Sequence, residues 1–501
     1  MRRLSRGARL GGLLALSAVL TLTGAAPTSE SWDAVYIAGS KVGHIHTFVE
    51  PVRDKERNRD LVRVRVDLDL KFRRLRDEVS LRMEYGTIEK PDGSVLRLDT
   101  RIHAAQQVMR VHGDVIDNTM KLTMDTGGQT QQQALAWGPD VRGPYAAEMS
   151  LARTPIKPGE SRPLKMYMPD LNDICEITLT AKAVEEVTLG GGVARQLLRV
   201  DQTTTHKGKP RPEFDVTLWV DTGGQVLKSK TDTLGGMVTY RTTKEGALAP
   251  NDLNPNTQFD QIANSVIKVV RKIPRPETTR DVLYRVTLKE DDPAKIIPAD
   301  RRQSLKSSSK STEATLEIKT AGPNSGEPGP ETIDNEYLRS NPLITSADPV
   351  VASLARKAVA GAKDPWEKAK KITHYVAKNL KDKNFEIGFA SAAEVARNLA
   401  GDCTEHGVLV AAMCRAEKVP ARVVVGLIYV ESLGGFGFHM WNEVYVNRRW
   451  VAVDATFDQD EVDAVHIKLS DSSLDGVSPF ESFLPVVRVL GKMTLETIEI
   501  R

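Results

Sequence analysis

The sequence predicts an α+β protein in which a large all-β N-terminal region precedes a region of helices packed on an antiparallel sheet. Residues 62–72 (VRVRVDLDLKF) alternate apolar and polar side chains, as a strand with one buried face does. Asp-Pro pairs at 348–349 and 364–365 each place a capping residue before a proline suited to a first helical turn. Apolar runs at 421–430 and 450–457 predict strands after the helices.

Residues 1–26 have the pattern of a secretory signal peptide. A basic start precedes the apolar run LGGLLALSAVLTLT (10–23), and small residues follow it. The run is shorter than the roughly 20 residues that a membrane span needs. We therefore expect export to the periplasm, cell envelope or extracellular space, with no transmembrane domain beyond this segment; an uncleaved anchor is the alternative.

The overall charge is nearly balanced, with 69 Lys and Arg against 66 Asp and Glu. Aromatic residues make up 5% of the chain, too few for an extended surface on which bases or sugars stack. These numbers give no reason to expect a nucleic-acid partner.

Three regions follow the signal peptide. Residues 31–250 alternate in period two between turns and predict a β-rich domain, whose role the sequence does not reveal. Residues 251–335 predict a β-containing connector that ends in the Gly- and Pro-rich linker GPNSGEPGPE. Residues 336–501 hold the helices and the later strands. Cys175 lies in a strand-like run of the first domain and is expected in its core.

The segment 365–380 is predicted to be a helix with one apolar stripe. Its apolar residues recur three or four positions apart, and Trp366 belongs to that series. We therefore expect Trp366 and His374 to serve the core and the helix face rather than a site.

The third predicted helix begins with Asp402-Cys403-Thr404-Glu405. Asp402 can cap it, and Glu405 three residues later can complete a capping box. Cys403 is then the first helical residue, where unpaired N–H groups and the helix dipole stabilise a thiolate and can hold a developing oxyanion. A merely structural cysteine at the cap fits this stretch equally well.

The three cysteines are expected to be free thiols, because nothing in their spacing favours a disulfide. Cys414 lies in the apolar middle of the same predicted helix as Cys403. No dipole end or base is near it in the sequence, so it is expected in the core.

A nucleophilic cysteine needs a base and a group that orients the base. Beyond a predicted Gly-rich loop at 431–437, two strands hold His439 and Asp454. A two-residue turn at 447–448 would pair Val446 with Arg449 and put His439 and Asp454 on one face as diagonal neighbours, about 7–8 Å apart. A three-residue turn would put them on opposite faces.

Four stretches, in this order and spacing, resemble the transglutaminase-like superfamily in its microbial exported form: GDCTEH (401–406), RAEKVPARVVVG (415–426), HMWNEVYV (439–446) and WVAVDATFDQ (450–459). The resemblance is strong over 385–470 and extends over 340–485. It implies a papain-like α+β core with a Cys-His-Asp triad. Cys403 would be the nucleophile, His439 the base and acid, and Asp454 the orienting carboxylate.

The chain departs from the family pattern at a few positions. Gly407 stands where the family often has Ala, and Ala455 where it often has Pro. The side-chain oxyanion donor of the animal enzymes has no clear counterpart, and no carboxylate cluster resembles their calcium sites. We expect no metal and no cofactor. His406 is a rival base on nearly the same helix side as Cys403, and the resemblance favours a structural role for it.

The resulting expectation is an exported thiol enzyme that acts on amide or peptide bonds of a protein or peptide, with cell-envelope peptides among the candidates. A thioester on Cys403 would pass to an amine, giving a cross-link, or to water, giving deamidation or proteolysis. The sequence leaves this choice open. The alternative from a different class is a non-catalytic binding or scaffolding protein that keeps the fold.

Overall fold

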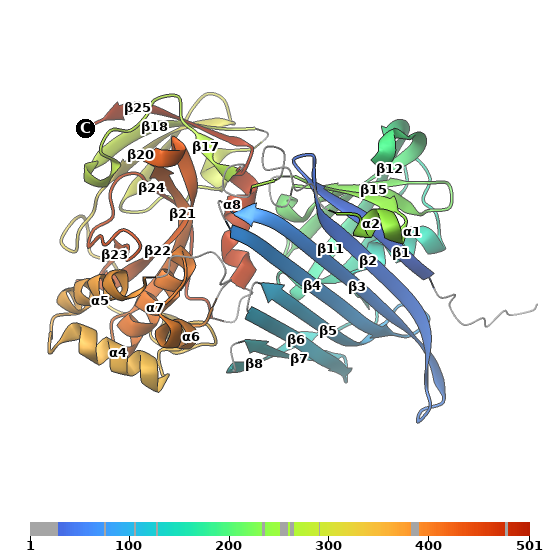
Figure 1. The fold of residues 1–501 in the computed structure, drawn as a ribbon, viewed down its shortest axis with the longest axis horizontal. Coiled ribbons are helices and arrows are strands. Elements are labelled where there is room, and N and C mark those ends of the chain that lie inside the picture. Colours follow the sequence, from blue (N-terminus) through green and yellow to red (C-terminus); the bar gives the residue numbers. More distant parts are fainter. Residues whose placement is uncertain are drawn as a thin grey trace, which may run out of the picture.

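The computed structural model describes residues 29–74, 77–104, 107–126, 129–232, 236–250, 259–260, 265–289, 291–381, 390–475 and 479–501. The expected signal peptide (1–26) lies outside these residues. Two halves stand side by side: an all-β half built from the first part of the chain, and a half in which helices cover a sheet (Figure 1).

Among the described residues, the N-terminal half is one 16-stranded sheet. Its strands in chain order are β1 (Ser29–Ile37), β2 (Ser40–Asp54), β3 (Arg59–Arg74), β4 (Asp77–Glu89), β5 (Val95–Ala104), β6 (Gln107–Ile116), β7 (Thr119–Thr126), β8 (Gln129–Ala136), β9 (Val141–Arg142), β10 (Ser161–Met168), β11 (Asp173–Thr188), β12 (Ala194–His206), β13 (Lys209–Pro210), β14 (Val216–Val220), β15 (Val226–Thr231) and β16 (Met237–Thr242). The short helices α1 (Ala146–Arg153) and α2 (Lys244–Leu248) accompany it.

The period-two pattern explains which side chains of this sheet are buried. In β3, Val62 and Val64 are buried, whereas Arg63 and Arg65 point to solvent. The sheet runs as an antiparallel meander from β8 to β1, continues through β16, β15, β14, β12, β11 and β10, and ends at β9. Met120 of β7 and Tyr167 of β10 come from strands near the two ends of the sheet, and they pack in one hydrophobic cluster. The sheet is therefore curled. The expectation of a large all-β N-terminal region is confirmed.

Two smaller sheets and a helical layer form the C-terminal half. The helices are α4 (Pro349–Val359), α5 (Pro365–Asn379), α6 (Ala392–Asn398), α7 (Cys403–Ala416) and α8 (Leu484–Val489). The strands are β17 (Ile267–Lys268), β18 (Asp281–Leu288), β19 (Gln303–Ser307), β20 (Glu313–Lys319), β21 (Ala421–Val430), β22 (Gly435–Val446), β23 (Arg449–Val453), β24 (His466–Ser472) and β25 (Met493–Ile500).

The larger of these two sheets has the order β17-β22-β21-β24, with β23 on β22, among the described residues. Helix α7 packs on β21 and β22, and α4, α5 and α6 pack on α7. Both predicted Asp-Pro starts are found: Asp348 and Asp364 accept hydrogen bonds from the first-turn N–H groups of α4 and α5. The C-terminal half is therefore a region of helices on an antiparallel sheet, as the sequence predicts.

The smaller sheet has the order β19-β20-β18-β25. Its strands β18, β19 and β20 belong to the expected connector (251–335), whereas β25 belongs to the expected third region (336–501). β17, also from the connector, pairs with β22. The strands of the connector are therefore part of the two sheets of the C-terminal half.

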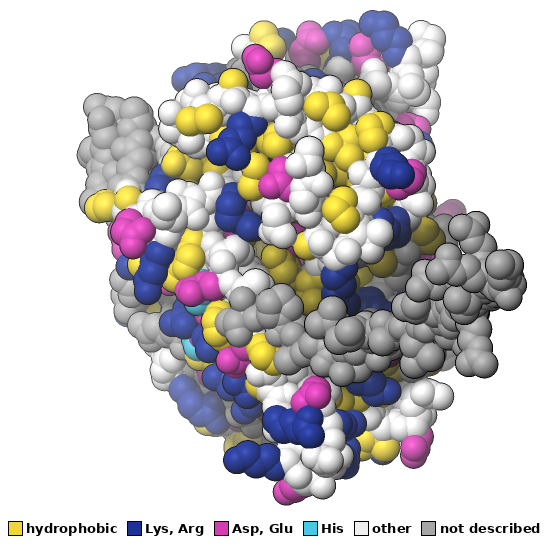
Figure 2. Space-filling view, turned by 90° about the vertical axis from the view of Figure 1, so that its right-hand side faces the viewer, with side chains coloured by type: hydrophobic (Ala, Val, Ile, Leu, Met, Phe, Trp, Pro, Cys, Tyr) yellow, Lys and Arg dark blue, Asp and Glu magenta, His cyan; other side chains and the backbone are white. Residues whose placement is uncertain are grey.

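Helix α8 belongs to the C-terminal half and packs against the N-terminal half; it lies between the two in Figure 1. Leu484 at its start is buried in the core of the N-terminal sheet, beside residues such as Leu151 and Phe214. Lys492 pairs with Asp232 across the same junction. On the face of the N-terminal half seen in Figure 2, Lys and Arg side chains lie interspersed with acidic and hydrophobic ones.

Two further sequence expectations meet the structure here. Over the residues that the structure describes, no helix is both long and apolar enough to cross a membrane. The sequence predicts a Gly-rich loop over 431–437, and this is wrong for its second part: β22 begins at Gly435, which pairs with Val430 and Lys268. A β-carbon at Gly435 would lie 2.5 Å from the Ile267 carbonyl oxygen, so this glycine lets β17 approach.

Candidate active site

Helix α7 begins at Cys403, and its start is fixed by a capping box. Oδ1 of Asp402 accepts the N–H of Thr404 at 2.8 Å, and the N–H of Asp402 donates to Oε2 of Glu405 at 3.0 Å. Cys403 is therefore the first helical residue, at the positive end of the helix dipole, as the sequence predicts. The N–H groups of Thr404 and Glu405 donate to the Asp402 side chain, so the cap uses two of the donors expected to serve an oxyanion.

The first turns of α7 lie directly on β22. The Asn442 side-chain amide donates to the Gly407 carbonyl at 2.9 Å. A β-carbon at Gly407 would lie 3.0 Å from Sδ of Met440, so the glycine allows this close approach. Cys403 stands one helical turn before Gly407, and Met440 directly follows His439. The structure thus ties the segment that carries the thiol to the strand that carries the histidine.

His439 and Asp454 are brought together directly. His439 Nε2 lies 2.6 Å from Asp454 Oδ2, and both side chains are buried, at 4% and 1% exposure. The turn that sets this register is the predicted one: Val446 pairs with Arg449, and Asn447 and Arg448 have φ angles of 49° and 60°, as in a primed two-residue turn. The predicted register is confirmed from Asn442 to Val446; β23 ends at Val453, so Asp454 lies just beyond the ladder.

Asp454 is held at both oxygens. Oδ1 accepts the N–H of Thr456 at 2.7 Å, and the backbone of Asp454 exchanges two hydrogen bonds with Gln459. Burial opposes the charge of this carboxylate, but the His439 imidazole and the hydrogen bonds from His439 and His466 outweigh burial and lower the pKa of Asp454 well below its usual range. An ionised Asp454 accepts the Nε2–H of His439, which leaves Nδ1 as the basic nitrogen of that ring.

A second histidine, His466, also contacts Asp454, and the sequence pattern does not predict this contact. His466 Nε2 lies 3.2 Å from Asp454 Oδ2, and His466 Nδ1 lies 2.7 Å from Asp463 Oδ1. His466 opens β24, which pairs with β21 and not with the strand of His439. The available signal was Asp463 three residues before a histidine at the start of an apolar run, which alone does not place either residue near Asp454.

Aromatic rings surround the His-Asp pair. The Trp441 ring lies roughly parallel to His439, with centroids 6.0 Å apart. The Phe457 ring meets His439 edge-on at 5.3 Å and is 50% exposed. Phe457 is therefore a half-exposed ring in contact with the buried His439.

The other candidate thiols and the rival base take structural positions. All three cysteines are free, as predicted. Burial raises the pKa of both Cys175 and Cys414 to about 12, so neither is a thiolate near neutral pH. His406 Nδ1 lies 2.7 Å from the Asp402 carbonyl oxygen, where its N–H can donate, so this ring supports the start of α7.

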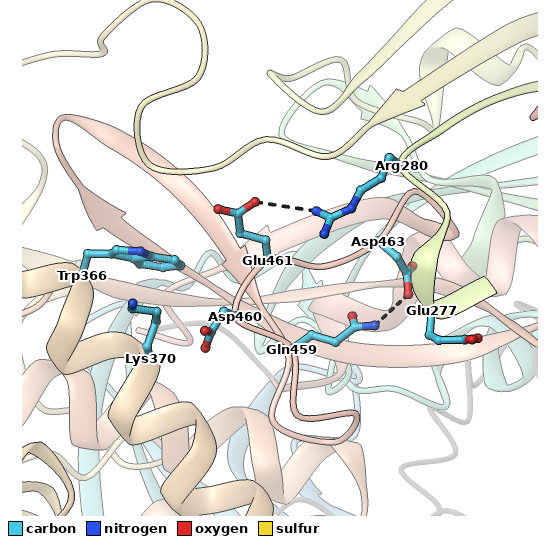
Figure 3. A pocket seen from close by; sticks show the side chains of 8 residues that line it. All are labelled: Glu277, Arg280, Trp366, Lys370, Gln459, Asp460, Glu461 and Asp463. Carbon is cyan, nitrogen blue, oxygen red and sulfur yellow. Dashed lines mark hydrogen bonds and ion pairs between the residues drawn. The ribbon is translucent and has the colours of Figure 1, made fainter. Parts of the chain in front are cut away.

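A polar cavity of about 430 Å³ lies beside the loop that follows Asp454. Trp366 and Lys370 of α5 face Asp460 and Asp463 across it (Figure 3). Trp366 packs partly on the core, as expected, and also lines this cavity. His374 is half-exposed on its helix face and pairs with Asp460 at 3.0 Å.

Among the described residues, His439, Asp454 and His466 also form a group of metal-ligand type, with their ligand atoms all within 4.8 Å of one another. Imidazole nitrogen and carboxylate oxygen are ligands that zinc accepts. In this structure each of the two histidines lies at hydrogen-bond distance from Oδ2 of Asp454.

Residues 352–455 match the family model of the transglutaminase-like superfamily, and this range contains Cys403, His439 and Asp454. No curated protein matches the chain in sequence. Similar solved structures include a putative cysteine protease from Cytophaga hutchinsonii, with 16% identity, 44% of this chain and 86% of that chain covered, and a TM-score of 0.29. A beta-barrel-like protein of unknown function from Brucella abortus has 10% identity, covers 43% of this chain and 96% of its own, and has a TM-score of 0.30.

Proposed function

Because residues 352–455 carry a transglutaminase-like core, we propose that this protein is an exported thiol enzyme that acts on carboxamide or peptide bonds through Cys403, His439 and Asp454. The observation that carries the proposal is the buried hydrogen bond of 2.6 Å between His439 Nε2 and Asp454 Oδ2. A buried carboxylate that fixes one nitrogen of a histidine is what a catalytic base requires.

The proposed reaction begins with transfer of the Cys403 proton to Nδ1 of His439. The thiolate then attacks the carbonyl carbon of the substrate and forms a tetrahedral intermediate. His439 returns the proton to the leaving amine, the C–N bond breaks, and a thioester on Cys403 remains. Asp454 stabilises the imidazolium that exists between the two proton transfers.

The position of Cys403 supports its proposed role. A thiol at a helix start gains from the helix dipole, and such thiols are acidic compared with a free cysteine. Cys414 lies in the same helix, at 0% exposure, with its pKa raised by burial to about 12. The two cysteines of α7 therefore lie in different surroundings, Cys403 at the first position of the helix and Cys414 in its apolar middle.

The thioester is resolved by a primary amine or by water. An amine gives a cross-link, and water gives deamidation when the leaving group is ammonia or proteolysis when it is a peptide amine. Phe457 is half-exposed and its ring lies 5.3 Å from the His439 ring, so it is the side chain we propose to contact the acyl acceptor. The substrate is proposed to be a protein or peptide, and cell-envelope peptides fit an exported enzyme.

Export is part of this proposal and rests on the basic start and apolar run of residues 1–26. Fractionation of producing cells tests it directly. We expect the mature chain outside the cytoplasm, with its N-terminus near residue 27 by mass; a cytoplasmic chain that keeps its first residues contradicts export.

The enzyme proposal is tested by product analysis. Wild type, Cys403→Ala and the matched control Cys414→Ala are incubated with glutamine-containing peptides, with and without a primary amine, and the masses of the products are followed. We expect wild type and C414A to change the peptides and C403A to leave them intact. Identical results for wild type and C403A on a broad peptide panel contradict the proposal and favour a binding protein.

A further inference from the structure

His466 is bound at both ring nitrogens by carboxylates, deep inside the C-terminal half. Its exposure is 0%. Nδ1 lies 2.7 Å from Asp463 Oδ1 and Nε2 lies 3.2 Å from Asp454 Oδ2. The partners come from opposite ends of one loop, because Asp454 follows β23 and Asp463 precedes β24.

This pattern fixes the protonation of the ring. A neutral imidazole has one N–H, whereas two carboxylate acceptors require two, so His466 is an imidazolium unless one acid is protonated. Burial disfavours the charge, but the hydrogen bonds and charges of Asp454 and Asp463 outweigh burial and raise the pKa of His466. Asp454 and Asp463 both have lowered pKa values, which agrees with two ionised partners.

The charged groups around His466 are few among the described residues. His439 lies with its ring centroid 5.8 Å away, on the other side of Asp454. The buried Arg302 donates to the backbone carbonyl oxygen of Asp463 at 2.6 Å and not to its carboxylate. The remaining ring neighbours at similar distances are Trp441 and Phe457, which carry no charge.

We propose that His466 is a positioning residue of the active site: a charged imidazolium, anchored by Asp463, that holds Asp454 in place from the side opposite His439. The chain of contacts runs Asp463, His466, Asp454, His439. With Oδ1 of Asp454 bonded to the Thr456 N–H, the carboxylate is restrained at both oxygens and cannot turn away from His439.

Asp463, the first residue in this series of contacts, lines the polar cavity. Asp463 Oδ2 accepts the side-chain amide of Gln459 at 2.8 Å, and both residues line the cavity wall (Figure 3). Asp463 is thereby held in turn, so the arrangement is fixed along its whole length. An imidazolium has no lone pair for a metal, so the proposal also assigns this histidine to protons and not to a metal ion.

The charge of His466 is measured on the wild-type protein without any variant. Selective ¹⁵N labelling of the nine histidines gives side-chain N–H spectra between about pH 5 and pH 9. The His466 signals are assigned by their loss in His466→Gln. We expect both ring nitrogens of His466 to keep their protons at neutral pH. A neutral tautomer at pH 7, or loss of the signals on addition of zinc alone with recovery on chelation, overturns the proposal.

Two variants separate positioning from a general structural role. Gln places its amide nitrogen near the position of Nε2 and keeps the donor to Asp454, whereas Asn places it near Nδ1 and keeps only the donor to Asp463. We expect His466→Gln to retain kcat within a few-fold and His466→Asn to lose about 100-fold in kcat with little change in KM, since small misplacements cost that much. Equal losses, or no loss in either variant, contradict positioning; near-UV circular dichroism checks that both are folded.

The kinetic comparison rests on the proposed function, but the spectra do not. If the wild type lacks Cys403-dependent activity, the proposed function fails, and the protonation of His466 still decides this inference. If activity is present and His466 is neutral, the inference fails and the proposed function stands.

Discussion

Glu405 offers a measurable link between the cap of α7 and the pH dependence of stability. The side chain is buried at 0% exposure. Its Oε2 accepts the N–H of Asp402 at 3.0 Å, and its Oε1 accepts the N–H of Ala390 at 3.2 Å. Burial and the neighbouring Asp402 carboxylate raise the pKa of Glu405 from 4.5 to about 8. Glu405 is therefore expected to be protonated in the folded protein near neutral pH.

The sign of the stability effect follows from that direction. The unfolded chain ionises Glu405 near pH 4.5, while the folded protein keeps the proton until about pH 8. The contribution is therefore fully present below pH 4.5 and is lost as pH rises through about 8. The free energy of unfolding falls by about 1.4 kcal/mol per pH unit across this window, at most about 5 kcal/mol in total.

Glu405→Gln replaces the protonated acid with a neutral side chain of equal length. We expect E405Q to remove this slope, so that the variant gains on the wild type as pH rises from about 5 to about 8. Urea unfolding at a series of pH values, followed by tryptophan fluorescence, gives the difference. The matched control is Glu394→Gln in the capping box of α6, where the carboxylate is only half-buried. Parallel curves for E405Q and wild type refute the reasoning, because they mean that Glu405 is ionised in the fold.

Three further outcomes are expected. Iodoacetamide at about pH 6 should label Cys403 well before Cys414 and Cys175, because only the thiolate reacts; peptide mass mapping checks this, and uniformly slow labelling contradicts an activated Cys403. Asp454→Asn should lower kcat by about 10³- to 10⁴-fold with the fold retained, as loss of a triad carboxylate does; steady-state kinetics and circular dichroism decide, and a loss under tenfold contradicts the orienting role. Gly426→Ala should destabilise the C-terminal half by roughly 3 kcal/mol or more, because its β-carbon would lie 2.1 Å from the Ile467 carbonyl oxygen; an unchanged melting temperature contradicts this.

Local patterns in the sequence predicted the parts of the site that depend on neighbours along the chain. The cap by Asp402 needs four consecutive residues, and the pairing of His439 with Asp454 needs one turn of known length. The turn at Asn447 formed although Arg448 replaces the usual glycine. These features are fixed by backbone geometry within a few residues, so a single sequence suffices to predict them.

The contact of His466 with Asp454 could not be predicted in this way. His466 contacts Asp454 because β24 pairs with β21, and β21 separates β24 from β22 in the sheet. The order of strands in a sheet depends on pairing between distant segments, which periodicity does not encode. The curl of the N-terminal sheet and the burial of Leu484 in its core also depend on contacts between segments that are distant in the sequence.

The smaller sheet of the C-terminal half bears on how the chain is made. β18 is a central strand with β20 on one side and β25 on the other, and β25 (Met493–Ile500) is synthesised about two hundred residues after β18. Until β25 is made, one row of β18 backbone groups lacks this partner and can pair with a strand of another chain. The interval in which β18 lacks this partner therefore ends only when β25 docks, and a tag that delays this docking prolongs the interval.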